Sequence, residues 1–225
     1  MIPLRDDRPP RTFAFATLAI VAANVAVFWH ELSLGSPGRL DAFFANFALT
    51  PADLTHAPSP NAARTVFTSM FLHGGWAHII GNMWFLWIFG RNVEDSIGHF
   101  KFIVFYLLCG MAAAAAQVGL SPDSTVPMIG ASGAISGVLG AYLLLFPRAR
   151  VLVLFPIWIF FRVFYVPALL FLVFWFGLQL LSGMAVLNSM DVDGGGVAFW
   201  AHVGGFIAGM FLIPVFKKRG VRLFQ

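Results

Sequence analysis

The sequence predicts an all-α membrane protein: a bundle of six transmembrane helices with both termini in the cytoplasm. Three observations predict this fold class. First, 59% of the 225 residues are hydrophobic and only 11% are charged, and a mean hydropathy of +0.82 leaves too little polar surface for a soluble globular monomer. Second, six long windows contain no charged residue. Third, Lys and Arg are concentrated in alternate gaps between these windows.

Each window is long enough for a membrane helix, which needs roughly 20 mostly apolar residues. In chain order the windows are 12–30, 65–90, 102–122, 124–147, 163–190 and 194–216. A shorter apolar stretch at 151–161 contains Pro156 and is too short to cross. We therefore expect an interfacial connection there rather than a span.

The positive charges predict the orientation, because cytoplasmic loops carry the excess of Lys and Arg near span ends. With the amino terminus inside, all 14 Lys and Arg residues except Arg39 and Arg64 fall on the cytoplasmic side. We expect one membrane domain over 1–225, with short cytoplasmic tails at 1–11 and 217–225. The net charge of +4 then reflects topology and contact with membrane lipids, and no nucleic-acid partner is expected.

The connecting segments and the cysteine content limit the possible sites. Segment 33–64 mixes turn formers with apolar residues, which predicts a short element in the outer interface. The glycine-rich loop Asn188–Gly196 should be the most mobile external segment, so Asp191 and Asp193 are poor candidates for a fixed site. The single Cys109 excludes a disulfide within the chain.

Ser132 and His202 are candidates for a nucleophile and a base. Polar side chains are costly at membrane depth and usually face an interior cavity. Ser132 lies in the segment Gly-Ala-Ser-Gly and His202 in Ala-His-Val-Gly-Gly, and both lie toward the external ends of their windows, hence at similar depth. A serine hydroxyl becomes an effective nucleophile when an adjacent imidazole takes its proton.

Small residues predict that the fourth and sixth windows pack closely enough to bring these two side chains together. Gly133 and Gly137 recur at an interval of four in the fourth window, and Ala201, Gly205 and Gly209 recur at the same interval in the sixth. Such stripes of small residues let helix backbones approach each other in lipid.

The second window supplies polar groups that suit an oxyanion site. His78 and Asn82 are four residues apart and so share one helix face at the external end. Amide hydrolysis passes through a tetrahedral oxyanion, which an Asn amide, an imidazole N–H and backbone N–H groups stabilise. The backbone N–H of Ser132, at the positive end of a helix dipole, is a third donor.

Each of these residues also has a plainer interpretation. A serine among glycines is commonly a packing residue, an asparagine joins helices by hydrogen bonds, and His73 shapes the turn before its span. Three imidazoles, from His73, His78 and His202, are also a possible zinc ligand set. The interval between His73 and His78 does not place both on one helix face, and the spans lack an acidic base, so no metal is expected.

Taken together and in this order, the motifs resemble those of the rhomboid family of intramembrane serine proteases, in the basic six-helix bacterial form. The resemblance runs through nearly the whole chain and includes a Gly-Arg-Asn-Val-Glu segment after the second window. The motif residues are His73, His78, Asn82, Gly90, Glu94, Gly98, Gly130, Ser132, Gly133, Ala201, His202 and Gly205.

The resemblance implies a Ser–His dyad without an aspartate, with Ser132 as nucleophile and His202 as general base. It implies that His78 and Asn82 hold the oxyanion, and that His73, Gly130 and Gly133 have supporting roles, while Gly137, Gly205 and Gly209 serve helix packing. Some relatives have a tyrosine that stacks on the catalytic imidazole four residues after the nucleophile, whereas this chain has Ser136.

The family also implies transmembrane protein substrates that are cleaved near the extracytoplasmic face, at sites where the helix unwinds easily and the side chain is small. Its fifth helix is discussed as a gate, which in this chain carries the bulky residues Phe171, Phe174, Trp175 and Phe176. We expect no cofactor and a location in the bacterial inner membrane. Two alternatives stay open: a pseudoprotease that binds transmembrane clients, and a small membrane transporter.

Overall fold

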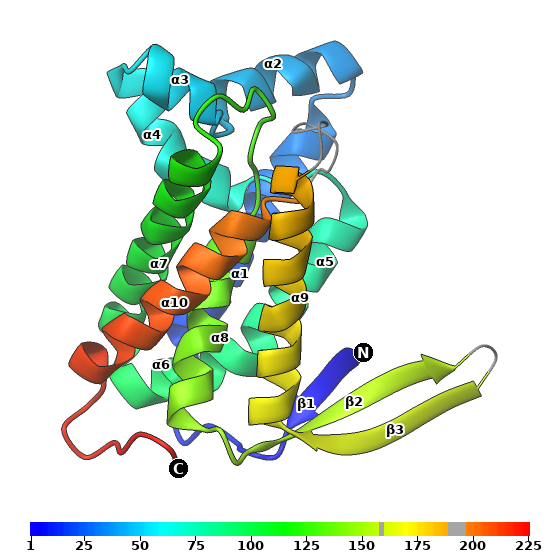
Figure 1. Cartoon of the computed structure of the whole chain (residues 1–225), viewed down its shortest axis with the longest axis vertical. Coiled ribbons are helices and arrows are strands. Elements are labelled where there is room, and N and C mark those ends of the chain that lie inside the picture. Colours follow the sequence, from blue (N-terminus) through cyan, green and yellow to red (C-terminus); the bar gives the residue numbers. More distant parts are fainter. Residues whose placement is uncertain (158–159, 189–196) are drawn as a thin grey trace.

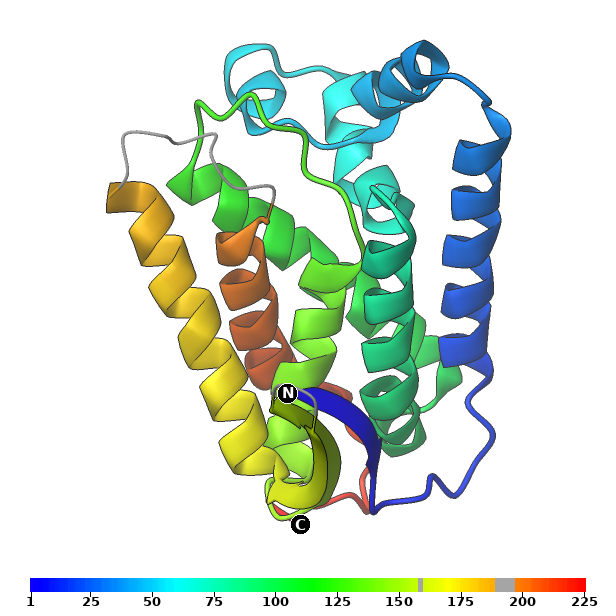
Figure 2. The same cartoon turned by 90° about the vertical axis from the view of Figure 1, so that its right-hand side faces the viewer.

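The computed structural model describes residues 1–157, 160–188 and 197–225. It is mostly helical, and its long helices run side by side along the long axis of the molecule (Figures 1 and 2). Within the described residues, four helices are long and apolar enough to cross a membrane. They are α1 (Phe15–Ser33), α7 (His99–Leu120), α9 (Ala168–Asn188) and α10 (Phe199–Phe216).

The second predicted span, at 65–90, is wrong in its bounds. It contains the end of α4 (Pro60–Thr68), the short η1 (Ser69–Phe71) and a break before α5 (Trp76–Phe85). Glycines 74 and 75 lie in this break, and glycine is a poor helix former. After it, α5, η2 (Leu86–Gly90) and α6 (Arg91–Ile97) follow one another directly. The continuous helical stretch is therefore shifted toward the carboxyl end of the window.

The fourth predicted span, at 124–147, is also too long. Its helix α8 (Ser132–Leu145) has only 14 residues, about 21 Å at 1.5 Å per residue. The preceding loop is held by an isolated antiparallel bridge between Leu49 and Met128. Gly130 has a φ of 117°, which glycine adopts readily, and the chain turns there into α8. Because α8 is buried along nearly its whole length, Ser132 begins a short central helix surrounded by longer ones.

A three-stranded antiparallel sheet corrects the expectation of an all-α fold. β1 (Ile2–Asp6) pairs with β2 (Arg150–Ile157), which pairs with β3 (Phe160–Pro167). β-branched and aromatic residues are frequent in β2 and β3, and such residues favour strands. The stretch predicted as an interfacial connection is thus largely a strand, and the fifth window begins as β3 before α9 starts at Ala168.

Three short helices form the connection between α1 and α5. They are α2 (Pro37–Phe47), α3 (Pro51–His56) and α4. Each begins with a proline that follows a serine or threonine, because the missing N–H of proline costs nothing in the first turn of a helix. The Ser59 hydroxyl accepts a hydrogen bond from the Ala62 N–H at 3.1 Å and caps α4.

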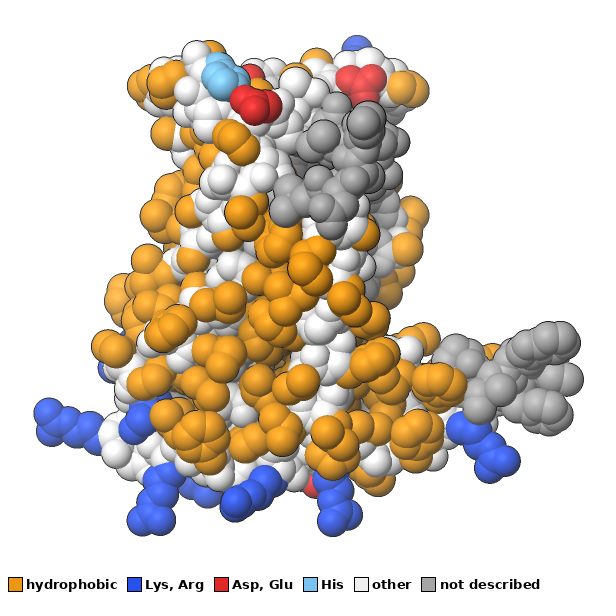
Figure 3. All heavy atoms as spheres, in the orientation of Figure 1, with side chains coloured by type: hydrophobic (Ala, Val, Ile, Leu, Met, Phe, Trp, Pro, Cys, Tyr) orange, Lys and Arg blue, Asp and Glu red, His pale blue; other side chains and the backbone are white. Residues whose placement is uncertain are grey.

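The two ends of the molecule differ in charge. Lys and Arg side chains gather at the end where the sheet lies, whereas α2 and α3 cover the opposite end, and a broad apolar belt separates them (Figure 3). We call these the basic end and the loop end. Both chain termini lie toward the basic end (Figure 1). The terminal segments pack against the bundle there, since Trp84 Nε1 donates to the Pro3 carbonyl at 2.6 Å and Phe224 N–H to the Leu144 carbonyl at 2.7 Å.

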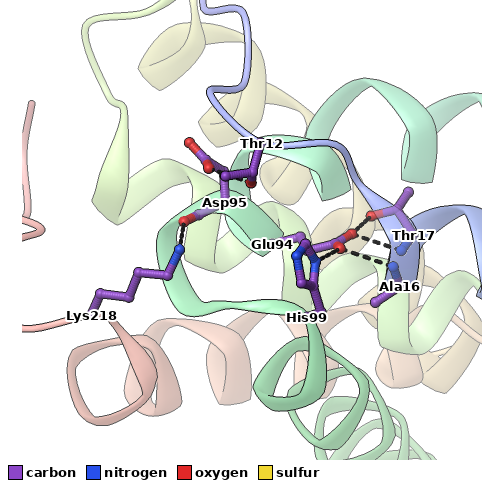
Figure 4. A network of polar contacts seen from close by, with 7 residues as sticks. All are labelled: Thr12, Ala16, Thr17, Glu94, Asp95, His99 and Lys218. Carbon is purple, nitrogen blue, oxygen red and sulfur yellow. Dashed lines mark hydrogen bonds and ion pairs between the residues drawn. The ribbon is translucent and has the colours of Figure 1, made fainter.

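A buried carboxylate ties α1 to α6 at the basic end (Figure 4). Glu94 has no exposed surface and accepts hydrogen bonds from the backbone N–H groups of Ala16 and Thr17 at 2.9 and 2.7 Å. It also accepts from the Thr17 hydroxyl at 2.6 Å and contacts His99 Nδ1 at 2.5 Å. The first turn of α1 is therefore capped by a side chain of another helix. These hydrogen bonds offset the cost of burying the Glu94 side chain.

Candidate active site

The helices α8 and α10 touch through their backbones. A Cβ atom added at Gly205 would overlap the Gly133 carbonyl oxygen, and one added at Gly209 would overlap that of Gly137. A Cβ at Gly133 would lie 2.7 Å from the Ala113 Cβ of α7. Only glycine fits at these crossing points, so the small-residue intervals of the two helices determine how closely their first turns approach.

This approach brings Ser132 next to His202. The Ser132 Oγ and His202 Nε2 atoms are 2.8 Å apart, although 70 residues separate them in sequence. Ser132 is the first residue of α8, and His202 lies in the first turn of α10. Both side chains are half-buried. A hydroxyl at hydrogen-bond distance from an imidazole is the arrangement that activates a serine.

Two residues of α9 contact the His202 ring on its other sides. His202 Nδ1 lies 2.7 Å from Gln179 Oε1, and the Trp175 ring centroid lies 5.9 Å from the imidazole centroid. The sequence interpretation missed Gln179, although a carboxamide inside an apolar, aromatic-rich window is an available signal. Ser136 donates to the Ser132 carbonyl at 2.6 Å, so its hydroxyl turns back onto α8.

His78 and Asn82 of α5 lie beside the loop that leads into Ser132. A Cβ at Gly130 would lie 2.6 Å from His78 Nε2 and 3.6 Å from Asn82 Nδ2. Gly130 therefore leaves open the space that these two side chains border. His78 Nδ1 accepts from the Gly74 N–H at 3.4 Å, which leaves the proton on Nε2, the nitrogen near Gly130.

His73 lies behind Asn82 and is almost completely buried, with 1% of its surface exposed. Its Nε2 is 3.0 Å from Asn82 Nδ2, and its Nδ1 is 3.3 Å from the Phe71 carbonyl oxygen. Because a carbonyl only accepts, Nδ1 carries the proton and Nε2 accepts from the Asn82 amide. His73 thus fixes which way the Asn82 carboxamide points, and its ring centroid lies 5.0 Å from that of His78.

One cavity of about 380 Å³ lies among α5, α7, α8, α9 and α10. Ser132, His202, His78 and Asn82 all border it, together with Gly130 and Trp175. The remaining lining is largely apolar. The cavity wall thus brings together a hydroxyl, two imidazoles and a carboxamide. The segment 189–196, with Asp191 and Asp193, lies outside the described residues.

Comparison with known proteins identifies the family of this chain. A family model described as the Rhomboid domain matches residues 60–219, and the chain belongs to the rhomboid family. It is 30% identical over 138 residues to Rhomboid protease AarA of Providencia stuartii, covering 56% of this chain and 48% of that protein.

Two further relatives come from a bacterium and a yeast. Rhomboid protease GluP of Bacillus subtilis is 33% identical over 146 residues, covering 65% of this chain and 24% of the relative. Mitochondrial Rhomboid protein 1 of Saccharomyces cerevisiae is 29% identical over 153 residues, covering 66% of this chain and 41% of the relative. The chain thus spans less than half the length of these relatives. Its family and its apolar helices make it a membrane protein.

Proposed function

We propose that this protein is an intramembrane serine endopeptidase that cleaves transmembrane substrate proteins. The observation that carries the proposal is the 2.8 Å contact between Ser132 Oγ and His202 Nε2, at the wall of a cavity that also holds His78 and Asn82. Relatives named as rhomboid proteases support the same reaction class.

The dyad accounts for each proton in the reaction. His202 Nε2 accepts the Ser132 hydroxyl proton as Oγ attacks the scissile carbonyl carbon, and the carbonyl π electrons move to oxygen. The resulting imidazolium donates this proton to the leaving amine as the C–N bond breaks. Water then attacks the acyl-enzyme, with His202 accepting its proton and returning it to Ser132 Oγ as the carboxylic acid product leaves.

The developing oxyanion is stabilised by donors that are held in place before substrate binds. Asn82 supplies the amide N–H that His73 does not use, and His78 supplies its Nε2–H. The backbone N–H of Ser132 contributes from the amino terminus of α8, where the helix dipole favours negative charge. Gly130 keeps this space free of side-chain atoms.

The membrane topology follows the charge distribution. We propose six spans, formed by α1, the continuous stretch α5–α6, α7, the short α8, α9 and α10. Both termini and the basic end then lie in the cytoplasm. The site lies toward the loop end of α8, so cleavage occurs near the extracytoplasmic face, and a bacterial inner membrane fits this orientation.

Substrate must unwind before it reacts. An intact helix hides its carbonyl groups in hydrogen bonds to residue i+4, so segments weakened by glycine or proline are the favoured substrates. The scissile segment arrives from lipid, and we propose that it enters laterally past α9, whose Trp175 borders the cavity.

Reconstituted protein with a generic transmembrane substrate tests the proposal. Ser132→Ala and His202→Ala should each abolish cleavage while retaining the parent protein's helical content and thermal stability. Cleavage by both variants at the parent rate would exclude Ser132 and His202 as the catalytic dyad. A parent protein that binds transmembrane substrates without cleaving them would instead support the pseudoprotease alternative.

A further inference from the structure

The imidazole of His202 is held by a single face of α9. Trp175 and Gln179 are four residues apart and so lie one above the other on that helix. Gln179 Oε1 is 2.7 Å from His202 Nδ1, and the Trp175 ring is inclined by 37° to the imidazole at a centroid distance of 5.9 Å. Trp175 also packs against Phe206 of α10, at 6.1 Å between ring centroids.

We propose that Gln179 and Trp175 are positioning residues that hold His202 in the productive tautomer and ring orientation. This inference rests on the proposed function and adds to it the groups that orient the catalytic base. An amide oxygen only accepts, so a hydrogen bond to Gln179 Oε1 requires the proton on His202 Nδ1. The Nε2 lone pair then faces the Ser132 hydroxyl, as a general base requires.

A neutral amide suits this position. A carboxylate would bring a net charge into an apolar, half-buried site, and an unpaired buried charge is costly. The carboxamide orients the ring by one hydrogen bond without that cost. Trp175 limits rotation of the same ring by contact, so the two side chains restrict different movements of His202.

The placement of both groups on α9 has a consequence for catalysis. Among the four long helices, α9 is the least embedded, with 22% of its apolar window buried against 33% for each of the other three. Displacing α9 from α10 would separate Gln179 and Trp175 from His202 at the same time. The base is therefore oriented only while α9 is in place, so a substrate that enters past α9 reacts after the helix has returned.

Three variants and one control test the roles of Gln179 and Trp175. Gln179→Leu keeps the approximate volume and removes the acceptor, so kcat should fall about 10- to 100-fold with little change in KM. Gln179→Glu keeps an acceptor oxygen but adds a charge, so it should recover the parent tautomer and only part of kcat. Trp175→Leu should lower kcat while leaving the tautomer unchanged. Leu181→Ala, at an exposed position of α9, should cleave at the parent rate.

A spectroscopic measurement separates positioning from general support of the fold. In protein with ¹⁵N-labelled histidine, the His202 signal, assigned by its loss in His202→Ala, should show a protonated Nδ1 and an unprotonated Nε2. In Gln179→Leu this signal should shift toward the other tautomer, and in Gln179→Glu it should return.

An unchanged kcat and tautomer in Gln179→Leu would overturn the inference, as would a lower kcat with the parent tautomer and no recovery in Gln179→Glu. The His202 tautomer is measured without substrate, so its result stands apart from the dyad test. If Ser132→Ala cleaved normally, the proposed function would fail whatever the Gln179 variants did.

Discussion

The backbone of Gly209 in α10 rests on the carbonyl group of Gly137 in α8, and a methyl group on Gly209 would overlap that oxygen. The contact lies two helical turns beyond His202 on the same helix. It therefore sets the distance between the two helices that carry the candidate dyad.

Gly209→Ala should destabilise the protein and reduce cleavage. The added methyl group meets backbone atoms that cannot rotate away, and overpacking of this kind costs about 1–3 kcal/mol. The free energy of unfolding from SDS titration measures the loss. Gly177→Ala in α9 is the matched control, because its Cβ would meet no atom within 4 Å among the described residues. Equal stability of the two variants would contradict the close contact.

Asn82→Ala should lower kcat by roughly 10²-fold, the usual effect of removing one of several oxyanion donors. His73→Ala should have a smaller effect in the same direction, because it removes the acceptor that orients the Asn82 amide. Steady-state cleavage with folding checked by circular dichroism measures both. If His73→Ala were slower than Asn82→Ala, the role of His73 would not run through Asn82.

Asp6 should make stability depend on pH. Burial raises the pKa of its carboxyl group above the ordinary value of 3.8, against the lowering effect of the Tyr142 hydrogen bond. An acid with a raised pKa binds more protons in the folded state than in the unfolded state. Its contribution to the free energy of unfolding is therefore full below pH 3.8 and declines as the pH rises through the folded pKa.

Asp6→Asn provides the test of this dependence. It keeps an acceptor oxygen for Asn92 and Tyr142, which donate to Asp6 Oδ2 at 2.6 and 2.7 Å, but it does not titrate. The parent should lose stability relative to Asp6→Asn as the pH rises above 3.8. The difference is obtained from the melting temperatures of both proteins, measured from pH 3.5 to 7.5. If the parent instead became more stable than Asp6→Asn as the pH rose, the pKa of Asp6 would not be raised in the folded protein.

The β2–β3 hairpin should lie in the cytoplasmic membrane interface. Phe161, Phe164 and Tyr165 expose 67, 45 and 47% of their surface, and aromatic side chains favour this zone. A spin label at Phe161→Cys, with Cys109 replaced by Ala, should be more accessible to oxygen than to a water-soluble nickel chelate. A label at the exposed Arg219→Cys should show the reverse. If the label at Phe161→Cys showed the same oxygen and nickel accessibilities as the label at Arg219→Cys, the hairpin would lie in water.

Locking α9 to α10 should block large substrates only. A Cβ at Gly183 would lie 3.4 Å from the Phe199 Cβ, close to the separation of about 3.5–4.5 Å in disulfides. Oxidised Gly183→Cys/Phe199→Cys should lose cleavage of a transmembrane substrate yet still react with a small fluorophosphonate, and reduction should restore cleavage. Undiminished cleavage in the oxidised protein would exclude entry past α9.

The sequence by itself determined the membrane class and the residues to examine. Charge-free windows report hydrophobicity directly, and a serine, a histidine and an asparagine stand out because polar groups are costly in lipid. The rhomboid family, too, was recognisable from the order of short motifs, and the family model confirms it.

Only the tertiary structure decided which apolar segments are helices and which way they face. Hydropathy does not distinguish a strand from a helix, so the apolar window 163–190 includes the end of β3 as well as α9. Hydropathy also does not distinguish side chains that face the protein core from those that face lipid, because both surroundings are apolar. Phe171 is 3% exposed, whereas Phe174, three residues later, is 53% exposed. The partnership of Gln179 with His202 depends on the rotation of α9 about its axis. That rotation is set by packing against α10, and no apolar pattern records it.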